Sequence, residues 1–532
     1  MIFLASTKAI LRAKTPQSAG VSAKIVNDFF KNAEEKGLDY HSLMVIRNGK
    51  VAVEWYNEPF DRNTTHSMYS VSKSFTATAI GFAVSEGLLS LDDKLIDFFP
   101  EYAPKKPDLQ FEKLTIHNLL RMSSGKQPSF LSDKAKVDWI EDYINSPWVF
   151  EPGEKFLYIN ENIYMLSAII NKVTGMSMRE YLNPRLFEPL GIDFPFWETD
   201  QNGIEAGGWG LYLKTEDLAK FMLCYLKNGK YKGEQVIPAE WVALATQKQI
   251  DNEYNRPGTD ASFGYGYCFW LDHLGGFRAD GMFSQFGIAF PEYNAVVVVN
   301  SSITIEQDGL DGIFDFFPKA FIEADENTEL DLTRSVAPAL SEYPEKEQEI
   351  TDRYIKFRKK LLLNLVGFQV SVLPLAITYM MSDKAGNIDM VKFDFNGEDC
   401  TFRWSEGDEH NIIALGMDGH YRYSTMTLGQ IEFKVCSNAT WIDDNTLLVS
   451  IRPIQTVGKR NLLFSFRPHD KVVMAPSSTP YVGDILSTLD GFFDQMIPNK
   501  KICTAFKKFV QFLPPLVEPK HYGKFIEGIK KR

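Results

Sequence analysis

The sequence predicts an α/β fold in which an antiparallel sheet is interrupted by a helical insertion, followed by a C-terminal all-β domain, either a barrel or a sandwich. Two apolar strand pairs lie near opposite ends of residues 1–325. Helical apolar spacing fills most of the sequence between them, and short alternating strands dominate residues 385–475. Strands from both ends of the first domain can therefore share one sheet.

The first elements are a helix and a hairpin. Residues 21–37 place their apolar side chains on one helical face. The apolar strands 42–46 and 51–55 then flank Asn48 and Gly49, which readily adopt the positive φ angles of a type I′ turn. This segment therefore predicts a helix followed by a tight β-hairpin.

A second strand pair, 287–290 and 295–300, completes the predicted sheet. Between the two pairs, helical apolar spacing recurs in five segments, at 71–86, 115–121, 161–174, 215–228 and 238–248. We therefore assign residues 1–325 to one domain, with helices inserted into an antiparallel sheet.

An acidic, proline-punctuated stretch follows this domain. We assign residues 326–384 to a linker and the first strands beyond it. The short strands of 385–475 are separated by glycine, aspartate and asparagine turns. Residues 385–532 are therefore predicted to form a β-rich domain that ends in a helical tail.

The composition is that of a globular protein and argues against general nucleic-acid binding. The chain has 532 residues, a net charge of −12 and 13% aromatic residues, which is typical of a globular protein. An acidic chain is a poor general binder of nucleic acid, because affinity for phosphates requires clustered Lys and Arg. We expect a small-molecule substrate and no nucleic-acid partner, and the sequence sets no oligomeric state.

Cysteine usage and the N-terminus predict a cytoplasmic location. The five cysteines are odd in number and scattered, so they define neither a disulfide framework nor a zinc site. No basic segment precedes the apolar N-terminal stretch, and Lys8 interrupts that stretch early, unlike a secretory signal peptide.

Two segments bear on membrane association. Residues 361–381 are uncharged over 21 positions, about the length of a membrane span, but polar residues and Pro374 interrupt them. We expect one or two buried strands there.

Residues 499–532 carry nine Lys or Arg against two Glu, with phenylalanines interleaved. A docked terminal helix with a solvated face is favoured over a helix on a membrane surface.

The candidate chemistry begins at Ser70. The sequence lacks a His-Glu-x-x-His zinc motif, a P-loop and a Gly-x-Ser-x-Gly elbow, so we expect no metal or cofactor. Ser70 and Lys73 directly precede an apolar helix, and their spacing puts them on one face. The Ser70 N–H can hold an oxyanion and a desolvated Lys73 can accept a proton, although Ser70 alone could be a simple helix cap.

Further motifs follow in order: Leu-Leu-x-Met-x-Ser-Gly at 119–125, Tyr-Ile-Asn at 158–160, and a glycine-bearing Ala-Asp-Gly-Met at 279–282. With these, the chain resembles the serine β-lactamase and penicillin-binding-protein-like hydrolases. The similar branch holds cephalosporinase-type β-lactamases, family VIII esterases and 6-aminohexanoate-oligomer hydrolases. The resemblance covers about residues 15–300 and implies a β-lactamase-like sheet with its helical insertion.

The resemblance implies a role for each matching residue. Ser70 is the acyl-accepting nucleophile, Lys73 its proton partner and Tyr158 the second general base. Asn160 orients Lys73 and the substrate. The backbone N–H groups of Ser70 and Met282 form the oxyanion hole.

The third motif departs from the family pattern. Ala279, Asp280 and Gly281 stand where cephalosporinases carry Lys-Thr-Gly. Gly281 and Met282 can still supply main chain to an oxyanion hole, but Ala279 cannot bind a substrate carboxylate, which favours a substrate other than a β-lactam. Asp280 could select a cationic substrate, and Trp209 is either a pocket wall or a packing residue.

The sequence therefore predicts a serine hydrolase that cleaves an ester or amide of a small molecule or short oligomer through an acyl-enzyme on Ser70. Two alternatives remain at this stage. One is a β-lactamase or penicillin-binding carboxypeptidase, and the other is a non-catalytic binding protein on the same fold.

Overall fold

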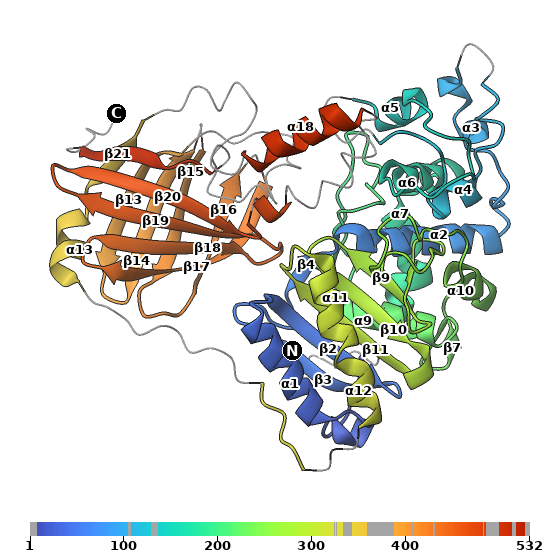
Figure 1. The fold of residues 1–532 in the computed structure, drawn as a ribbon, viewed down its shortest axis with the longest axis horizontal. Helices are drawn as coiled ribbons and strands as arrows, with labels where there is room; N and C mark the ends of the chain where they lie inside the picture. The colour runs from blue at the N-terminus through green and yellow to red at the C-terminus, as the bar shows by residue number, and fades with distance from the viewer. Residues whose placement is uncertain are drawn as a thin grey trace. The chain divides into compact units, whose positions relative to one another are not determined.

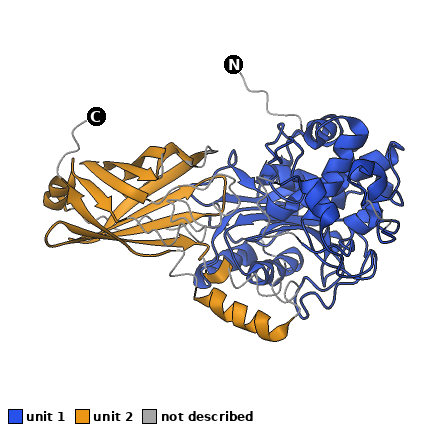
Figure 2. Ribbon diagram, turned by 90° about the horizontal axis from the view of Figure 1, so that it is seen from above, with its two compact units in different colours: residues 1–332 blue, residues 333–532 orange. Residues whose placement is uncertain are grey.

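The structure is a computed structural model with two compact units, residues 1–332 and 333–532 (Figure 2). It describes residues 8–104, 108–128, 137–323, 325, 327–332, 343–358, 388–406, 409–428, 431–481, 483–485, 499–512 and 518–526. The uncharged run at 361–381 lies outside these residues, as does most of the predicted linker. No helix in the described ranges has both the length and the apolar character that a bilayer span requires.

The first unit is built on a seven-stranded sheet (Figure 1). In spatial order its strands are β1 (Leu11–Arg12), β3 (Lys50–Tyr56), β2 (Tyr40–Arg47), β11 (Ala295–Ser301), β10 (Gln285–Phe290), β9 (Phe277–Gly281) and β8 (Trp270–Leu271). Every neighbouring pair is antiparallel except β1 with β3. Strands β2 and β11 join at the centre, so the prediction of one sheet made from both ends of the domain is confirmed.

The β2–β3 hairpin has the predicted turn. Asn48 has a φ of 53° and Gly49 a φ of 76°, the two positive angles that a type I′ turn requires. Because this turn matches the right-handed twist of the strands, it fixes the register in which Arg47 faces Lys50 and Ile46 faces Val51. A register shift between Ile46 and Val45 then places Val45 opposite Val53.

Helices cover both faces of the sheet, because alternate residues of each strand point to opposite sides. On β2, Leu43 and Val45 join one buried cluster, and Met44 and Ile46 join another. The first cluster packs against α1 (Ala23–Glu35), α11 (Glu306–Phe314) and α12 (Phe317–Ile322). The second packs against α2 (Ser72–Ser85) and α9 (Thr215–Leu226). The result is a three-layer arrangement (Figure 1).

The predicted helical insertion lies between β3 and β8. Besides α2 and α9 it contains α3 (Leu95–Phe98), α4 (Ile116–Leu120), α5 (Trp139–Asn145), α6 (Glu161–Thr174), α7 (Met178–Leu182), α8 (Glu188–Leu190) and α10 (Ala239–Ala245). Two small ladders, β4 (Thr65–Ser67) with β5 (Tyr212–Lys214) and β6 (Lys230–Tyr231) with β7 (Glu234–Gln235), accompany them. Helix α2 is buried on nearly every side, so this insertion encloses the segment that follows Ser70.

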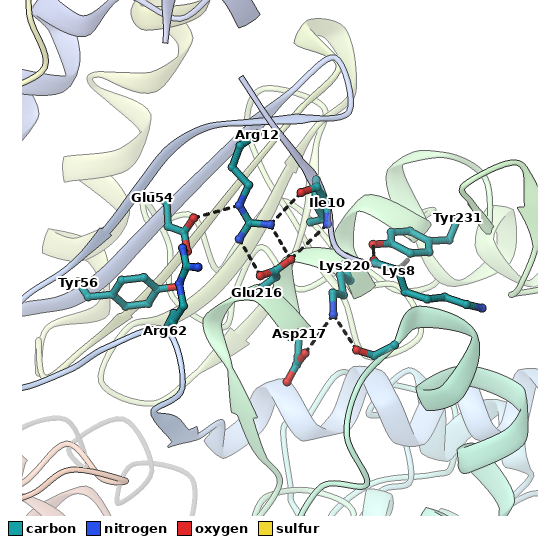
Figure 3. A network of polar contacts seen from close by, with 11 residues as sticks. Lys8, Ile10, Arg12, Glu54, Tyr56, Arg62, Glu216, Asp217, Lys220 and Tyr231 are labelled. Atoms are coloured by element: carbon teal, nitrogen blue, oxygen red, sulfur yellow. Dashed lines mark hydrogen bonds and ion pairs between the residues drawn. The ribbon is translucent and has the colours of Figure 1, made fainter. Parts of the chain in front are cut away.

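Side chains hold the short edge strand β1 in place (Figure 3). Arg12 lies 2.7 Å from Glu216 of α9 through Nη2 and 3.1 Å from Glu54 of β3 through Nε. The Ile10 amide donates a hydrogen bond of 3.2 Å to the same Glu216 carboxylate. A two-residue parallel ladder is weak by itself, so this ion-pair network supplies the attachment that the backbone lacks.

The second unit is built on a β-barrel. In spatial order the described strands are β15 (Glu409–Gly416), β14 (Asp399–Glu406), β13 (Ile388–Asn396), β12 (Tyr354–Phe357), β21 (His521–Ile526), β20 (Lys471–Thr479), β19 (Lys459–Arg467), β18 (Thr446–Pro453), β17 (Ile431–Asp443) and β16 (Arg422–Leu428). A further pairing of Gly416 with Asn438 joins β15 to β17 and closes the sheet. Of the two predicted forms, barrel and sandwich, the barrel is observed.

Helices α13 (Pro344–Ile350) and α18 (Lys500–Gln511) belong to this unit, and the terminal tail is only partly helical. Residues 521–526 form strand β21. His521 and Gly523 are buried, whereas Tyr522 and Lys524, which alternate with them, are exposed. This period of two fits a strand between β12 and β20 and does not fit a helix.

The contact between β10 and α9 depends on a glycine. A Cβ atom on Gly287 would lie 2.6 Å from Met222 Cγ and 3.3 Å from Leu218 Cδ1 of α9.

We expect Gly287→Val to lower the free energy of unfolding of the first unit by about 1–3 kcal/mol through overpacking. Denaturant unfolding followed by tryptophan fluorescence measures this. Lys50→Val, at an exposed position of the same sheet, is the control and should change it by less than about 0.5 kcal/mol. Equal midpoints for the two variants would contradict this account of the packing.

Candidate active site

Ser70 lies in a tight turn at the start of α2. A short 3₁₀ turn, Tyr69–Val71, leads directly into the helix. Tyr69 has a φ of 45°, a left-handed conformation that is costly for a bulky side chain and is retained only where the surroundings enforce it. Ser70 is half-buried in this turn, as expected for a hydroxyl that a small molecule can reach.

Lys73 lies one turn further along and is the polar centre of the site. Its side chain is only 1% exposed. The Nζ atom donates to Ser70 Oγ at 2.8 Å, to Asn160 Oδ1 at 2.7 Å and to the Gly208 carbonyl at 2.7 Å. An ammonium group has three N–H donors, so these acceptors satisfy all of them.

Burial changes the charge state of this lysine. Removal from water disfavours the ammonium form and lowers the pKa of Lys73 to about 7, although the nearby Cys268, Glu161 and Asp280 oppose the shift. Near neutral pH a large fraction is therefore the free amine. Only the amine has the lone pair that can take a proton from Ser70.

Tyr158 shows the opposite behaviour. Lys73 Nζ lies 4.8 Å from the centre of its ring. Burial raises the pKa of Tyr158 well above its usual value, and the hydrogen bond with Ser70 offsets only part of this rise. The ring centres of Trp270 and Tyr265 lie 5.4 and 6.2 Å from the ring centre of Tyr158. These apolar rings account for the low polarity around the phenol. Tyr158 is therefore a neutral phenol at physiological pH.

The two acceptors opposite Ser70 come from separate segments. Asn160 is the N-cap residue of α6. Gly208 lies in the loop before β5, and a Cβ on it would lie 3.0 Å from the Asn160 carbonyl. The adjacent Trp209 is half-buried and packs against Trp139 at 5.4 Å between ring centres. A small residue at 208 is needed for the loop to bring its carbonyl to Lys73.

The end of β9 lies against the turn that carries Ser70. A Cβ on Gly281 would lie only 2.4 Å from the Met68 carbonyl, so glycine is required for this close approach. Met282 follows directly and is half-buried. The main chain of Gly281 and Met282 is thereby brought next to the start of α2, where the sequence places the oxyanion hole.

Asp280 is paired within the protein. Arg278 Nε donates to Asp280 Oδ2 at 2.9 Å, and Arg278 itself is 1% exposed. Burial raises the pKa of Asp280 and the neighbouring Arg278 opposes that rise. Glu306 of α11 lies near enough to Asp280 for their charges to interact, and it pairs with Arg256 at 3.1 Å. The carboxylate of Asp280 therefore already has a cationic partner.

Comparison with known proteins identifies the family. The β-lactamase family profile matches residues 27–313, just over half of the chain. The chain belongs to the β-lactamase family. The matched range lies within the first unit, which holds all of the site residues described above.

Individual relatives of this β-lactamase family member are distant. A β-lactamase of Escherichia coli K12 is 25% identical over 192 residues, 32% of this chain and 50% of that protein. A putative D-alanyl-D-alanine carboxypeptidase of the same strain is 22% identical, over 48% of this chain and 75% of that one. A solved structure of a putative 6-aminohexanoate-dimer hydrolase from Bacillus anthracis has a TM-score of 0.45 and 21% identity, covering 55% of this chain and 80% of that chain. The chain spans about half to two thirds of the length of the first curated relatives it matches.

The structure brings together Ser70, Lys73, Tyr158 and Asn160 as the sequence predicts, and adds two groups that the sequence analysis missed. The Gly208 carbonyl could not be predicted, because a backbone acceptor requires no particular side chain. The Gly207-Gly208 pair was the only trace of it in the sequence. Arg278 could have been found, because residues two apart on a strand share a face and Arg278 precedes Asp280 by two.

The lowered pKa of Lys73 predicts how the reactivity of Ser70 depends on pH. We expect covalent labelling of Ser70 by a fluorophosphonate probe to accelerate as the pH rises through about 7, because Lys73 must lose its own proton first. The measurement is the second-order labelling rate between about pH 5.5 and about 8.5.

Lys126 provides the matched control. Burial also lowers its pKa to about 7, but its ammonium donates to the carbonyls of Ile144 and Ser146. Lys126→Met should therefore leave the pH profile unchanged. A flat profile in the unmodified protein, or one that disappears in Lys126→Met, would contradict the assignment to Lys73.

Proposed function

We propose that this protein is a serine hydrolase that cleaves an ester or amide bond of a small molecule or short oligomer through an acyl-enzyme on Ser70. The observation that carries the proposal is the 2.8 Å hydrogen bond between Ser70 Oγ and Lys73 Nζ, with burial lowering the pKa of that lysine to about 7. A nucleophile paired with a base whose pKa is near ambient pH is the arrangement that acyl transfer requires.

In the acylation step, the neutral Lys73 amine takes the hydroxyl proton while Ser70 Oγ forms a bond to the substrate carbonyl carbon. The carbonyl electron pair moves onto oxygen, and the N–H groups of Ser70 and Met282 stabilise that oxyanion. Tyr158 then donates its phenolic proton to the leaving oxygen or nitrogen as the bond to the carbonyl carbon breaks, and it regains a proton from the Lys73 ammonium.

Deacylation repeats this sequence with water as the nucleophile. A water molecule attacks the acyl carbon and transfers a proton to the Lys73 amine. The second tetrahedral intermediate then collapses, the bond to Ser70 Oγ breaks, and the Lys73 ammonium returns a proton to Oγ as the acid is released. Because the pKa of Tyr158 is raised and that of Lys73 is lowered, we assign the base to Lys73 and the acid to Tyr158, and Asn160 to holding Lys73 in place. This modifies the sequence-based role of Tyr158 as a second base.

The pairing of Asp280 bears on substrate choice. Because Arg278 already bonds its carboxylate, we propose that Asp280 fixes the end of β9 next to Ser70 and does not recognise a substrate cation. Ala279 is fully buried and has no polar side chain for a substrate carboxylate. We propose Trp209 as part of the pocket wall, beside the Gly208 carbonyl.

The first test compares substrates. We expect short-chain p-nitrophenyl esters or ω-amino-acid amides to be turned over at least about tenfold faster in kcat/KM than nitrocefin and other cephalosporins, a difference of about 1.4 kcal/mol in transition-state stabilisation. Ser70→Ala should abolish turnover and covalent labelling, whereas Ser72→Ala, two residues further along the chain, should retain labelling of Ser70.

Three outcomes would contradict this proposal. Cephalosporin turnover equal to or faster than ester turnover would favour a β-lactamase, and stable penicillin acylation would favour a carboxypeptidase. Failure of fluorophosphonate and penicillin probes to label the folded protein would instead indicate a non-catalytic binding protein.

The second test asks whether the base and the acid act as one unit. We expect Lys73→Ala and Tyr158→Phe each to lower kcat by at least about 10²-fold, the usual scale for loss of general acid–base catalysis. The double variant should be scarcely slower than the slower single variant, because either loss interrupts the same proton path. Tyr265→Phe, on a ring 6.2 Å from Tyr158, is the control and should retain most of kcat. Multiplicative losses in the double variant would contradict a shared path.

A further inference from the structure

Helix α18 (Lys500–Gln511) in the second unit has two sharply different faces. Its start is fixed by Asn499, whose side chain accepts hydrogen bonds from the amides of Lys501 and Ile502. At 100° per residue, the apolar side chains fall on one half of the helix and the lysines on the other. The lysines are Lys500, Lys501, Lys507 and Lys508.

Only part of the apolar half is covered. Cys503 and Val510 are buried, seven residues apart on one edge of that half. Ile502, Phe509 and Phe512 are 59%, 57% and 74% exposed on the remainder. Two large apolar side chains exposed on this helix, with a third at its C-cap, Phe512, form the kind of apolar patch that marks an interaction surface.

The charge of this segment opposes that of the chain. Residues 499–512 hold four lysines and no acidic residue, whereas the whole chain has a net charge of −12. Lys501 and Lys508 stand at one border of the apolar half, where their ammonium groups can lie level with the exposed rings. A surface that binds this helix must therefore be apolar beneath and negatively charged along its edges.

The sequence alone favours a docked helix here, but the exposure of Ile502, Phe509 and Phe512 favours the alternative. We propose that α18 binds in the plane of an anionic lipid bilayer, with these three side chains inserted among the acyl chains and the lysines among the headgroups. An interfacial helix combines an apolar face with a lysine-rich polar face in this way, and its affinity adds buried apolar area to attraction for anionic lipid. Nucleic acid would use the lysines but would leave the aliphatic Ile502 in water, so the bilayer fits the exposed face better.

The experiment uses the full-length protein and sedimentation with vesicles. One set of vesicles is phosphatidylcholine alone and the other contains about one third phosphatidylglycerol. We expect binding to the anionic vesicles at least about tenfold stronger than to the neutral ones, and weaker binding as salt is raised. Circular dichroism of the unbound fraction reports that the protein is folded.

Two pairs of variants separate the apolar and charged contributions. Phe509→Glu with Phe512→Glu should reduce the partition coefficient by at least about tenfold, and Lys501→Glu with Lys508→Glu should do the same on anionic vesicles. Ile412→Glu with Ile442→Glu replaces two side chains of similar exposure, 58% and 57%, on the barrel strands. This control pair should bind as the unmodified protein does.

Three results would overturn the proposal. These are no binding to anionic vesicles by folded protein, an equal loss in the control pair, and binding that is the same on neutral and anionic vesicles. Displacement of the protein from vesicles by a short oligonucleotide, with the Phe509→Glu, Phe512→Glu pair still binding that oligonucleotide, would assign the lysines to nucleic acid instead.

Discussion

The burial of one lysine ammonium sets the architecture of the first unit. Lys73 cannot be removed from water unless its N–H groups find acceptors, because an unsatisfied buried charge is among the most destabilising features a fold can contain. The three acceptors come from the start of α2, the N-cap of α6 and the loop before β5. These segments must therefore converge, and the insertion of helices between the two halves of the sheet brings them together. The same burial that imposes this convergence tunes the lysine for proton transfer.

Much of this arrangement follows from local sequence patterns. The Asn48-Gly49 turn and the period-two apolar strands predict the hairpin and its partners, and the Ser70–Lys73 spacing predicts a shared helical face. Features that depend on distant contacts were not predictable. Strand β1 consists of two residues held by Arg12 and Glu216, which are remote in sequence. Strand β21 follows a helix in a basic tail, and its side-chain alternation spans too few residues to stand out.

The net charge around Asp280 is close to zero. Asp280 alone suggests a negatively charged pocket, but Arg278 pairs with Asp280 and Arg256 pairs with the neighbouring Glu306. A local balance of this kind matters for Lys73, because an uncompensated carboxylate would stabilise its ammonium form and raise its pKa. By pairing with Asp280, the buried Arg278 therefore helps keep Lys73 in its neutral form, which can accept a proton.

The central pairing of β2 with β11 also has a consequence for biosynthesis. Arg47 pairs with Ala295, so the inner edge of the first hairpin lacks its partner until almost the whole unit has left the ribosome. At roughly 5–20 residues per second, that interval is on the order of 10 to 50 s. Throughout it, an apolar strand with open hydrogen-bonding groups is available to other nascent chains. The fold that buries Lys73 therefore has a high contact order. It is most exposed to aggregation before β11 and the segments around it have been synthesised.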